Sequence, residues 1–362
     1  MRILHIAQIL QGGTASHLSE VLPHQSALWG RDNVAMLAPA DQAHYLTALD
    51  RQQIRTFPTA ERSFGALAAL MRAAGRLIEE WQPDIIHLHG TFAGLMIRLR
   101  RLMNARKRRV PLVYCSHGWS FNMQVSPWVR TGYGLIERVL ASQADRIICI
   151  SRFEYDTALR RGIPASRLRT IYNGIADIGD DSLAAAPHDD PDGPVRLLFM
   201  GRDCAQKGYD TLVAAMRLIP PAQAQLVSVG PEASSLDPAS LQALGWVGRD
   251  DIPGHVARCD AVVVPSRWEG FGLVVIEAMR QSRAVIASTV DALPEIVADG
   301  VTGFLVPPDD VAALAARLSS LDRGTLSAMG ARGRQVYVDR FTADMMNSQI
   351  ISVYEELQTS SR

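Results

Sequence analysis

Residues 261–277, AVVVPSRWEGFGLVVIE, decide the fold class of this chain because they read as a strand, a glycine loop and a helix in direct succession. The apolar β-branched run 261–264 ends at a proline, as a buried parallel strand does, and residues 273–280 have helical periodicity. Gly270 and Gly272 therefore lie at a helix N-terminus, where unpaired N–H groups and a positive partial charge attract anions. The stretch predicts an α/β unit with a site for phosphate.

Two carboxylates flank this predicted phosphate site. Glu269 lies in the loop and Glu277 lies about five residues inside the helix, so a rise of ~1.5 Å per residue separates them by roughly 8 Å along the axis. At that spacing they would contact different parts of one extended ligand. An ordinary strand–turn–helix connection with two solvated carboxylates explains this stretch equally well.

Length and composition describe an ordinary globular protein of two domains. A chain of 362 residues exceeds the size at which a single core stops growing. With 48% hydrophobic residues and a formal net charge of zero, nothing demands a nucleic-acid partner. The cysteines lie far apart without a C-x-x-C pair, which favours reduced, buried thiols over a disulfide framework or a metal site. They are Cys115, Cys149, Cys204 and Cys259.

We expect the chain to act in the cytoplasm. No apolar run in the sequence approaches the length of a membrane span. The N-terminus enters a predicted strand at once, without a cleavable signal.

Strand-like runs alternate with helical stretches in both halves of the chain, which predicts two doubly wound parallel sheets. The predicted strands are 2–7, 34–38, 85–88, 112–115 and 146–150, then 195–200, 225–229, 261–264 and 284–287. The acidic, proline-bearing stretch 176–193 lacks periodicity and predicts a linker. We therefore expect a first domain over 1–175, a second over 194–340, and a C-terminal helix within 341–362 that crosses back to the first domain.

Gly12 and Gly13 follow the first predicted strand and precede a predicted helix over 17–28. Such a pair lets a ligand approach the backbone closely, although simple loop geometry explains it as well. The G-x-G-x-x-G spacing of a dinucleotide fingerprint is missing.

Ligands of doubly wound sheets bind beyond the carboxyl ends of the strands. The polar residues at the predicted ends are His87, His89, Ser116, His117, Gly118 and Ser151. His117, in a Ser-His-Gly-Trp loop, suits a hydrogen bond to a ligand hydroxyl, although a lone histidine more often has a structural role. His87 and His89 would share one strand face like a metal-binding pair, but no third ligand follows at a suitable spacing. The aspartate pairs 250–251 and 309–310 lack the strand context of a metal site, and we interpret them as solvated.

Residues 96–109 are the most unevenly charged stretch, with seven basic side chains and no acidic one. The basic residues are Arg98, Arg100, Arg101, Arg106, Lys107, Arg108 and Arg109. Interleaved apolar residues would suit an anionic membrane surface or an anionic acceptor. A solvated helix end explains the stretch equally well, and nucleic acid fits less well because no aromatic residues are interleaved for stacking.

The first strand of the second half leads into GRDCAQKG, residues 201–208. This glycine-bounded loop carries Arg202 and Lys207 at the carboxyl end of the strand. Because arginine binds phosphate through a planar fork and lysine as a point charge, the pair suits a diphosphate.

Three motifs occur together: Gly-Arg-x4-Lys-Gly at 201–208, the E-x7-E pattern Glu-Gly-Phe-Gly-x4-Glu at 269–277, and Leu-Pro-Glu-Ile-Val-x-Asp-Gly-x-Thr-Gly-Phe-Leu-Val at 293–306. They resemble the retaining glycosyltransferases of family four, of the bacterial surface-polysaccharide type. The Ser-His-Gly at 116–118 falls in the family's order, as do Gly12-Gly13 and Asn173-Gly174, so the resemblance covers nearly the whole chain. It implies a GT-B fold, with two facing Rossmann-like domains and the active site in the cleft between them.

The resemblance also implies site residues. Arg202 and Lys207 would bind the donor diphosphate, and Glu277 would accept hydrogen bonds from the ribose. Glu269 would face the transferred sugar, and His117 would contact one of its hydroxyls. Further donor contacts would come from Gly13, Gly230, Val247, Gly270, Phe271, Gly272 and Leu273. Family members need no metal ion, so we expect no cofactor, and the nucleotide sugar is a substrate.

The chain departs from the family at Asp291-Ala292, where a glycine pair often precedes Leu-Pro-Glu. The first domain varies with the acceptor in this family, and stretch 96–109 suggests a peripheral enzyme that extends a lipid-linked saccharide. The separation of Glu269 and Glu277 also fits the ~6.5–9.5 Å of an inverting hydrolase, but a hydrolase has no diphosphate for the two cations to neutralise. A nucleotide-sugar epimerase and a non-catalytic sugar-nucleotide-binding module remain as alternatives.

Overall fold

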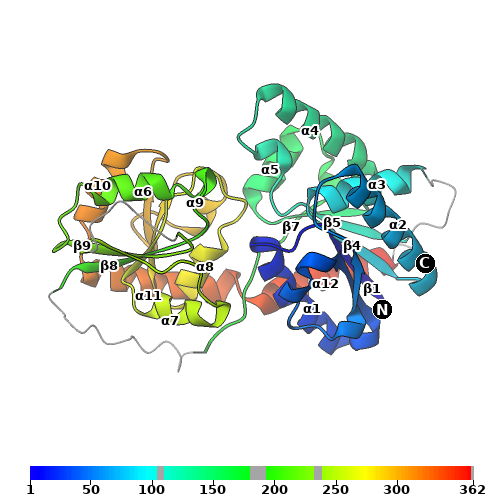
Figure 1. Ribbon diagram of the computed structural model, residues 1–362, viewed down its shortest axis with the longest axis horizontal. Coiled ribbons are helices and arrows are strands. Elements are labelled where there is room, and N and C mark those ends of the chain that lie inside the picture. Colours follow the sequence, from blue (N-terminus) through cyan, green and yellow to red (C-terminus); the bar gives the residue numbers. More distant parts are fainter. Residues whose placement is uncertain (104–109, 180–192, 232–238, 360–362) are drawn as a thin grey trace. The chain divides into compact units, whose positions relative to one another are not determined.

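The computed structural model describes residues 1–103, 110–179, 193–231 and 239–359. The chain divides into two compact units, Met1–Gly174 with Ala343–Arg362, and Ile175–Thr342. Each unit is a parallel sheet covered by helices on both faces (Figure 1). Most of the predicted linker, residues 180–192, lies outside the described residues.

The first unit contains a seven-stranded sheet in the order β3-β2-β1-β4-β5-β6-β7, with every neighbouring pair parallel. Its strands are β1 (Ile3–Ala7), β2 (Val34–Pro39), β3 (Ile54–Phe57), β4 (Ile85–His89), β5 (Leu112–Cys115), β6 (Arg146–Cys149) and β7 (Leu168–Thr170). Its helices are α1 (Gly13–Trp29), α2 (Phe64–Trp81), α3 (Thr91–Met103), α4 (Pro127–Leu140), α5 (Arg152–Arg160) and α12 (Ala343–Thr359).

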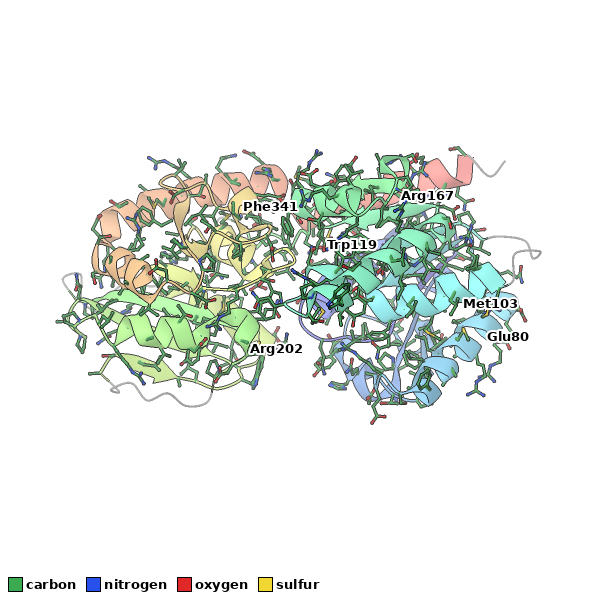
Figure 2. The ribbon with its side chains drawn as sticks, turned by 90° about the horizontal axis from the view of Figure 1, so that it is seen from above. Glu80, Met103, Trp119, Arg167, Arg202 and Phe341 are labelled. Atoms are coloured by element: carbon green, nitrogen blue, oxygen red, sulfur yellow. The ribbon has the colours of Figure 1, made fainter. Side chains whose placement is uncertain are left out.

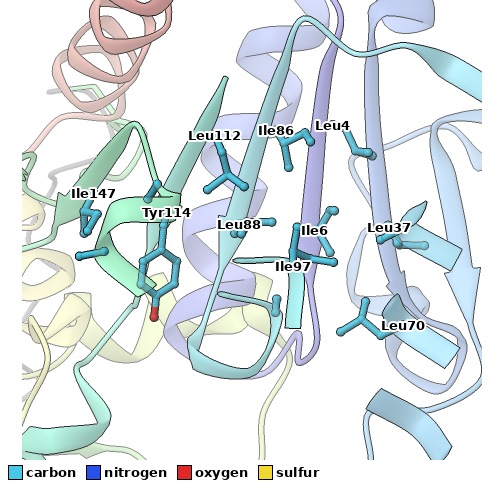
Figure 3. Close-up of a cluster of buried hydrophobic side chains, with 14 of the residues drawn as sticks. Leu4, Ile6, Leu37, Leu70, Ile86, Leu88, Ile97, Leu112, Tyr114 and Ile147 are labelled. Carbon is cyan, nitrogen blue, oxygen red and sulfur yellow. The ribbon is translucent and has the colours of Figure 1, made fainter. Parts of the chain in front are cut away.

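Strand β1 separates two hydrophobic cores because its side chains alternate between the faces of the sheet. Leu4 and Ile6 pack with Leu70 of α2 and Ile97 of α3, as Figure 3 shows. The opposite face packs against α1, with Leu18 among the buried residues there. The odd-numbered face of β1 and β4 therefore carries the polar side chains that concern the site.

The second unit contains a six-stranded parallel sheet in the order β10-β9-β8-β11-β12-β13. Its strands are β8 (Val195–Met200), β9 (Ala224–Val229), β10 (Leu241–Ala243), β11 (Ala261–Val264), β12 (Ala284–Ser288) and β13 (Gly303–Val306). Its helices are α6 (Tyr209–Met216), α7 (Ile252–Ala257), α8 (Leu273–Arg280), α9 (Leu293–Ile296), α10 (Val311–Ser319) and α11 (Arg323–Arg340).

The strand–loop–helix unit predicted from 261–277 is confirmed, since β11 and α8 have the predicted bounds. All nine predicted strands form, within one or two residues at their ends. The strands that the sequence pattern does not predict are β3, β7, β10 and β13, which are the edge strands of the two sheets. β3, β7 and β10 contain polar residues and lack the continuous apolar run that marks a central strand, whereas β13, with the sequence GFLV, is apolar but only four residues long. Helix α1 begins at Gly13, four residues before its predicted start.

The assignment of Arg98 to a surface patch is wrong. Arg98 is fully buried, donates to Glu137 Oε2 at 2.8 Å, and lies over the ring of Tyr114. Arg100 pairs with Glu79, and Arg101 pairs with Asp145. The acidic partners come from other elements, so a count of charges within the stretch could not find them. Arg106, Lys107, Arg108 and Arg109 lie outside the described residues.

Among the described residues, none of the helices combines the length and apolarity needed to cross a membrane. All four cysteines are free thiols. Cys115, Cys149 and Cys259 are buried as predicted, whereas Cys204 is partly exposed in the loop after β8. Burial raises the pKa of the Cys259 thiol to about 12, so that thiol is unreactive at neutral pH.

Replacing Arg98 by methionine would leave the Glu137 carboxylate buried without its partner. We expect this change to lower the free energy of unfolding by about 3–5 kcal/mol. The matched change Arg100→Met removes a more exposed pair and should cost at most about 1 kcal/mol. Urea unfolding followed by circular dichroism measures both, and equal losses in the two variants would contradict the assignment of a buried ion pair.

Candidate active site

The strand order reverses between β8 and β11 in the second unit, which is where ligands of doubly wound sheets bind. Loop 201–208 follows β8 and loop 265–272 follows β11. Because β8 and β11 are parallel neighbours, both loops leave the same edge of the sheet. The motifs found in the sequence at 201–208 and 269–277 therefore meet at one place.

Backbone contacts join the two loops. Arg267 N–H donates to the Gln206 carbonyl at 2.8 Å, and Gln206 Nε2 donates to the Trp268 carbonyl at 3.2 Å. Gly208 has a φ of 62°, and a Cβ added there would lie 2.0 Å from the carbonyl oxygen of Pro265. Any side chain at this position would force the loops apart, so only glycine fits.

The Arg267 side chain ties both loops to α6 and to the segment before α10. Its guanidinium donates to both carboxylate oxygens of Asp210, at 2.9 and 2.7 Å, and pairs with Asp309 at 2.5 Å. Asp210 raises the pKa of Arg267, and Arg267 in turn lowers the pKa of Asp210. The interpretation of Asp309 as a merely solvated acid is therefore wrong, and its neighbour Asp310 caps α10 through Ala313 N–H.

Lys207 and Glu269, predicted to act on different parts of the donor, form an ion pair. Lys207 Nζ donates to Glu269 Oε2 at 2.6 Å, and both side chains are largely buried. The hydroxyl of Ser266 donates to the same oxygen at 3.4 Å. Arg202, by contrast, is exposed on the second unit (Figure 2). The site thus offers one cation that is paired and one that is exposed.

Helix α8 begins at this site as the sequence predicted. Gly272 is its N-cap residue, with a φ of 95°, and Leu273 is its first residue, so the first N–H groups of the helix point toward the loop. Glu277 lies in the fifth helical position and is partly buried. Phe271 is buried, with its ring 5.8 Å from that of Phe341. Its side chain therefore anchors the loop.

Asp291 is a site residue that the sequence pattern indicates only as a departure from the family. Its carboxylate accepts the backbone N–H of Glu269 at 2.7 Å, and its φ is 48°. Burial raises the pKa of Asp291, the hydrogen bond opposes this rise, and the charge of Glu269 adds to it. Aspartate tolerates a left-handed backbone better than most residues, and glycine adopts it freely. An aspartate in place of the family's glycine is therefore the sequence signal that could have identified Asp291 as a site residue.

Gly230, at the end of β9, also packs backbone against backbone. Its φ is 110°, and an added Cβ would lie 2.0 Å from the Gly201 carbonyl oxygen. Its N–H donates to the Gly245 carbonyl at 2.7 Å. Val247, the other residue predicted to lie near the nucleotide base, is partly buried just beyond this contact.

The first unit places its predicted residues at the carboxyl edge of its own sheet. Gly12 precedes α1 with a φ of 58°, and Gly13 is the first residue of that helix. His117 has a φ of 54° and shares a hydrogen bond of 3.0 Å between its Nε2 and Nδ1 of His89. Burial, and then the nearby His17, lower the pKa of His117, so the ring is neutral at pH 7.

Two family models match the chain. Residues 11–177 match the family described as Glycosyltransferase Family 4, and residues 194–322 match Glycosyl transferases group 1. An "Uncharacterized 41.2 kDa protein in cps region" of Klebsiella pneumoniae is 29% identical, over 86% of this chain and 87% of that protein. A D-inositol 3-phosphate glycosyltransferase of Saccharomonospora viridis is 30% identical, over 77% of this chain and 71% of its own length.

Solved structures share the fold over nearly the whole chain. Anabaena Alr3699/HepE, determined in complex with UDP and glucose, aligns with a TM-score of 0.79 at 23% identity, over 98% of this chain and 100% of that one. Sucrose-phosphate synthase from Thermosynechococcus elongatus aligns with a TM-score of 0.82 at 22% identity, over 99% and 100%. At these identities the likeness establishes the fold.

The two parallel sheets and their glycine loops are those of a glycosyltransferase with the GT-B fold. The chain belongs to glycosyltransferase family 4, and it transfers a sugar from a nucleotide-sugar donor.

Substitutions at Asp291 separate its two contributions to the loop. Asp291→Gly loses a hydrogen bond to a charged group, about 1.5–3 kcal/mol, and Asp291→Ala adds about 1–2 kcal/mol of left-handed backbone strain. Asp291→Asn keeps an acceptor oxygen and tolerates the backbone, so it should unfold closest to the natural chain. Urea unfolding gives the order, and an alanine variant as stable as the asparagine one would refute the role assigned here.

Proposed function

We propose that this enzyme transfers a hexose, with retention of anomeric configuration, to a lipid-linked saccharide during synthesis of a surface polysaccharide. The relative from the cps region supports the polysaccharide, and the structural relative solved with UDP and glucose supports a nucleotide-hexose donor. The observation that carries the proposal is the position of Lys207 beside the N-terminus of α8 at the β8–β11 reversal.

The donor binds along the carboxyl edge of the second sheet. Its diphosphate lies against the α8 N-terminus, where Lys207 and Arg202 supply positive charge. Glu277, farther along α8, accepts hydrogen bonds from the ribose, and the base lies near Gly230 and Val247. Because the cations come from the chain, no metal ion is needed at the diphosphate, and they stabilise the charge that develops on the leaving group.

The transferred sugar lies beside Glu269. This carboxylate is already engaged by Lys207 and Ser266, so it orients sugar hydroxyls and is poorly placed as a nucleophile. The acceptor hydroxyl attacks on the face of the departing diphosphate, and a donor phosphate oxygen takes its proton. His117, on the first unit, is suited to a hydrogen bond with a sugar hydroxyl.

A thermal-shift screen with UDP-, GDP- and ADP-hexoses identifies the donor, because a ligand that binds the folded state raises the unfolding midpoint. Incubation with the best donor and a saccharide acceptor, followed by NMR of the new glycosidic bond, reports its configuration. The proposal requires retention. An isomerised donor formed without acceptor would instead show an epimerase, and binding without turnover would show a binding module.

Lys207→Ala should lower kcat/KM about 10²–10³-fold, because it removes one preorganised charge from the leaving diphosphate. Arg332→Ala is the matched control, since Arg332 is an exposed cation on α11, outside both loops. Steady-state kinetics with a fixed acceptor measure both. Comparable rates in the two variants would contradict a diphosphate role for Lys207.

Glu269→Ala should lose activity that added azide does not restore. Azide rescues enzymes whose missing carboxylate forms a covalent glycosyl intermediate, and the orientation role proposed here forms none. Chromatography of the reaction for a glycosyl azide measures the outcome. Formation of that product at a rate near that of the natural enzyme would overturn the direct front-face transfer.

A further inference from the structure

Five histidines gather on the odd-numbered face of the first sheet. They are His5 of β1, His17 of α1, His87 and His89 of β4, and His117 after β5. His5, His87 and His89 are completely buried. Neutral polar rings are costly to bury unless every nitrogen has a partner, so this cluster requires an explanation beyond packing.

His5, His87 and His89 have the arrangement of a three-histidine metal site. His5 lies directly opposite His87 in the parallel pairing of β1 and β4, and His89 follows two residues later on the same face. The rings of His87 and His89 are 4.2 Å apart between centroids. One ring nitrogen from each of the three residues lies within 4.8 Å of those of the other two. Spacing along the chain predicts no third ligand after His89, whereas the sheet supplies one from the neighbouring strand β1.

One nitrogen of this triple has no partner. His87 Nδ1 lies 2.6 Å from the hydroxyl of Tyr354, on α12, while His87 Nε2 is buried without a hydrogen bond to any described residue. His5 Nδ1 and His89 Nε2 lie 2.9 Å apart, at the distance of a shared proton. Nδ1 of His5 and Nε2 of His87 and His89 thus form at most one hydrogen bond among the three of them.

The opposite nitrogen of each ring does have an outward partner. His5 Nε2 lies 2.8 Å from Gln25 Oε1, and His89 Nδ1 lies 3.0 Å from Nε2 of His117. Because His87 Nδ1 contacts the Tyr354 hydroxyl, each of the three rings can donate one N–H to a partner outside the triple. Its other nitrogen then keeps a lone pair directed at the other two rings. Metal-binding histidines almost always donate their second N–H in this way, because that contact fixes the tautomer.

We propose that Nδ1 of His5 and Nε2 of His87 and His89 bind one transition-metal ion of the zinc class. Three neutral imidazoles and no carboxylate select Zn²⁺, Co²⁺ or Ni²⁺ over Mg²⁺ or Ca²⁺. Bonds of about 2.0–2.1 Å in a tetrahedral site put two ligand nitrogens about 3.3 Å apart. The His5–His89 pair therefore opens by a few tenths of an ångström as the metal replaces the shared proton.

Burial prepares these rings for a metal. It lowers the pKa of His5 to about 4 and lowers the pKa values of His87 and His89 well below the usual value. Neutral imidazoles bind a metal without first releasing a proton at pH 7.

The second histidine triple, His17, His89 and His117, fits a metal less well. His17 Nδ1 has an outward partner in Asn173, but His117 Nδ1 has none among the described residues. His117 is also only partly buried. The first triple has all three outward contacts and complete burial.

A metal in this site would set the hydrogen-bonding role of His117. A His89 ring bound through Nε2 carries its proton on Nδ1 and donates it to His117 Nε2. The proton of His117 then lies on Nδ1, so His117 presents a donor to any ligand. This inference does not rest on the proposed function, because metal binding is measured without turnover.

The test is a titration of the full chain, freed of metal by a chelator, with Co²⁺ and Zn²⁺. We expect one equivalent of Co²⁺ with the intense d–d absorption of a tetrahedral nitrogen site, and a higher unfolding midpoint with Zn²⁺ but not with Mg²⁺. Absence of stoichiometric binding, or binding with a six-coordinate spectrum, would overturn the proposal.

Variants locate the ion. His87→Gln should weaken Co²⁺ binding at least 100-fold. Tyr354→Phe removes the hydroxyl that contacts His87 Nδ1 and accepts from Gln25 Nε2, and it should weaken binding about 10–100-fold. The control His44→Gln changes an exposed histidine and should have no effect, and His17→Gln should also leave the affinity unchanged. If His87→Gln fails to fold, Tyr354→Phe still decides. Unchanged affinity in Tyr354→Phe, or loss of binding in His17→Gln, contradicts the assigned ligands.

Discussion

The candidate donor site depends on close approach of backbone to backbone where the strand order reverses in the second sheet. Gly208 lies against the carbonyl of Pro265, and Gly230 lies against the carbonyl of Gly201. In each case a Cβ added to the glycine would lie 2.0 Å from the carbonyl oxygen. These contacts hold the ends of β8, β9 and β11 together. The charged side chains then follow from the backbone, because Lys207 and Glu269 can pair only when the two loops touch.

Ion pairs and hydrogen bonds link the loops in the absence of a ligand. Arg267 forms ion pairs with Asp210 and Asp309 and thereby supports the loops. Lys207 instead forms an ion pair with Glu269 within the site. Such preorganisation is what stabilises a developing negative charge effectively, since no dipole has to reorient during reaction. Asp291 completes the arrangement by fixing the Glu269 backbone from a third loop.

Most of the fold could be predicted because central parallel strands are continuous apolar runs, and 261–264 and 195–200 were identified to the residue. Edge strands such as β3, with exposed Arg55 and Thr56, carry no such pattern. The donor loops were predictable because their residues are close in sequence within each motif. Contacts between distant segments could not be predicted. The ion pair of Arg98 with Glu137 and the pairing of His5 with His87 become visible only in the folded structure.

The most direct test of the account is a crystal structure of the full chain with a nucleoside diphosphate. We predict that the diphosphate binds at the N-terminus of α8, with Lys207 Nζ within hydrogen-bond distance of a phosphate oxygen. We also predict that a ribose hydroxyl donates a hydrogen bond to Glu277. A diphosphate bound away from loops 201–208 and 265–272, with the Lys207–Glu269 pair unchanged and no ligand contact to Glu277, would contradict it.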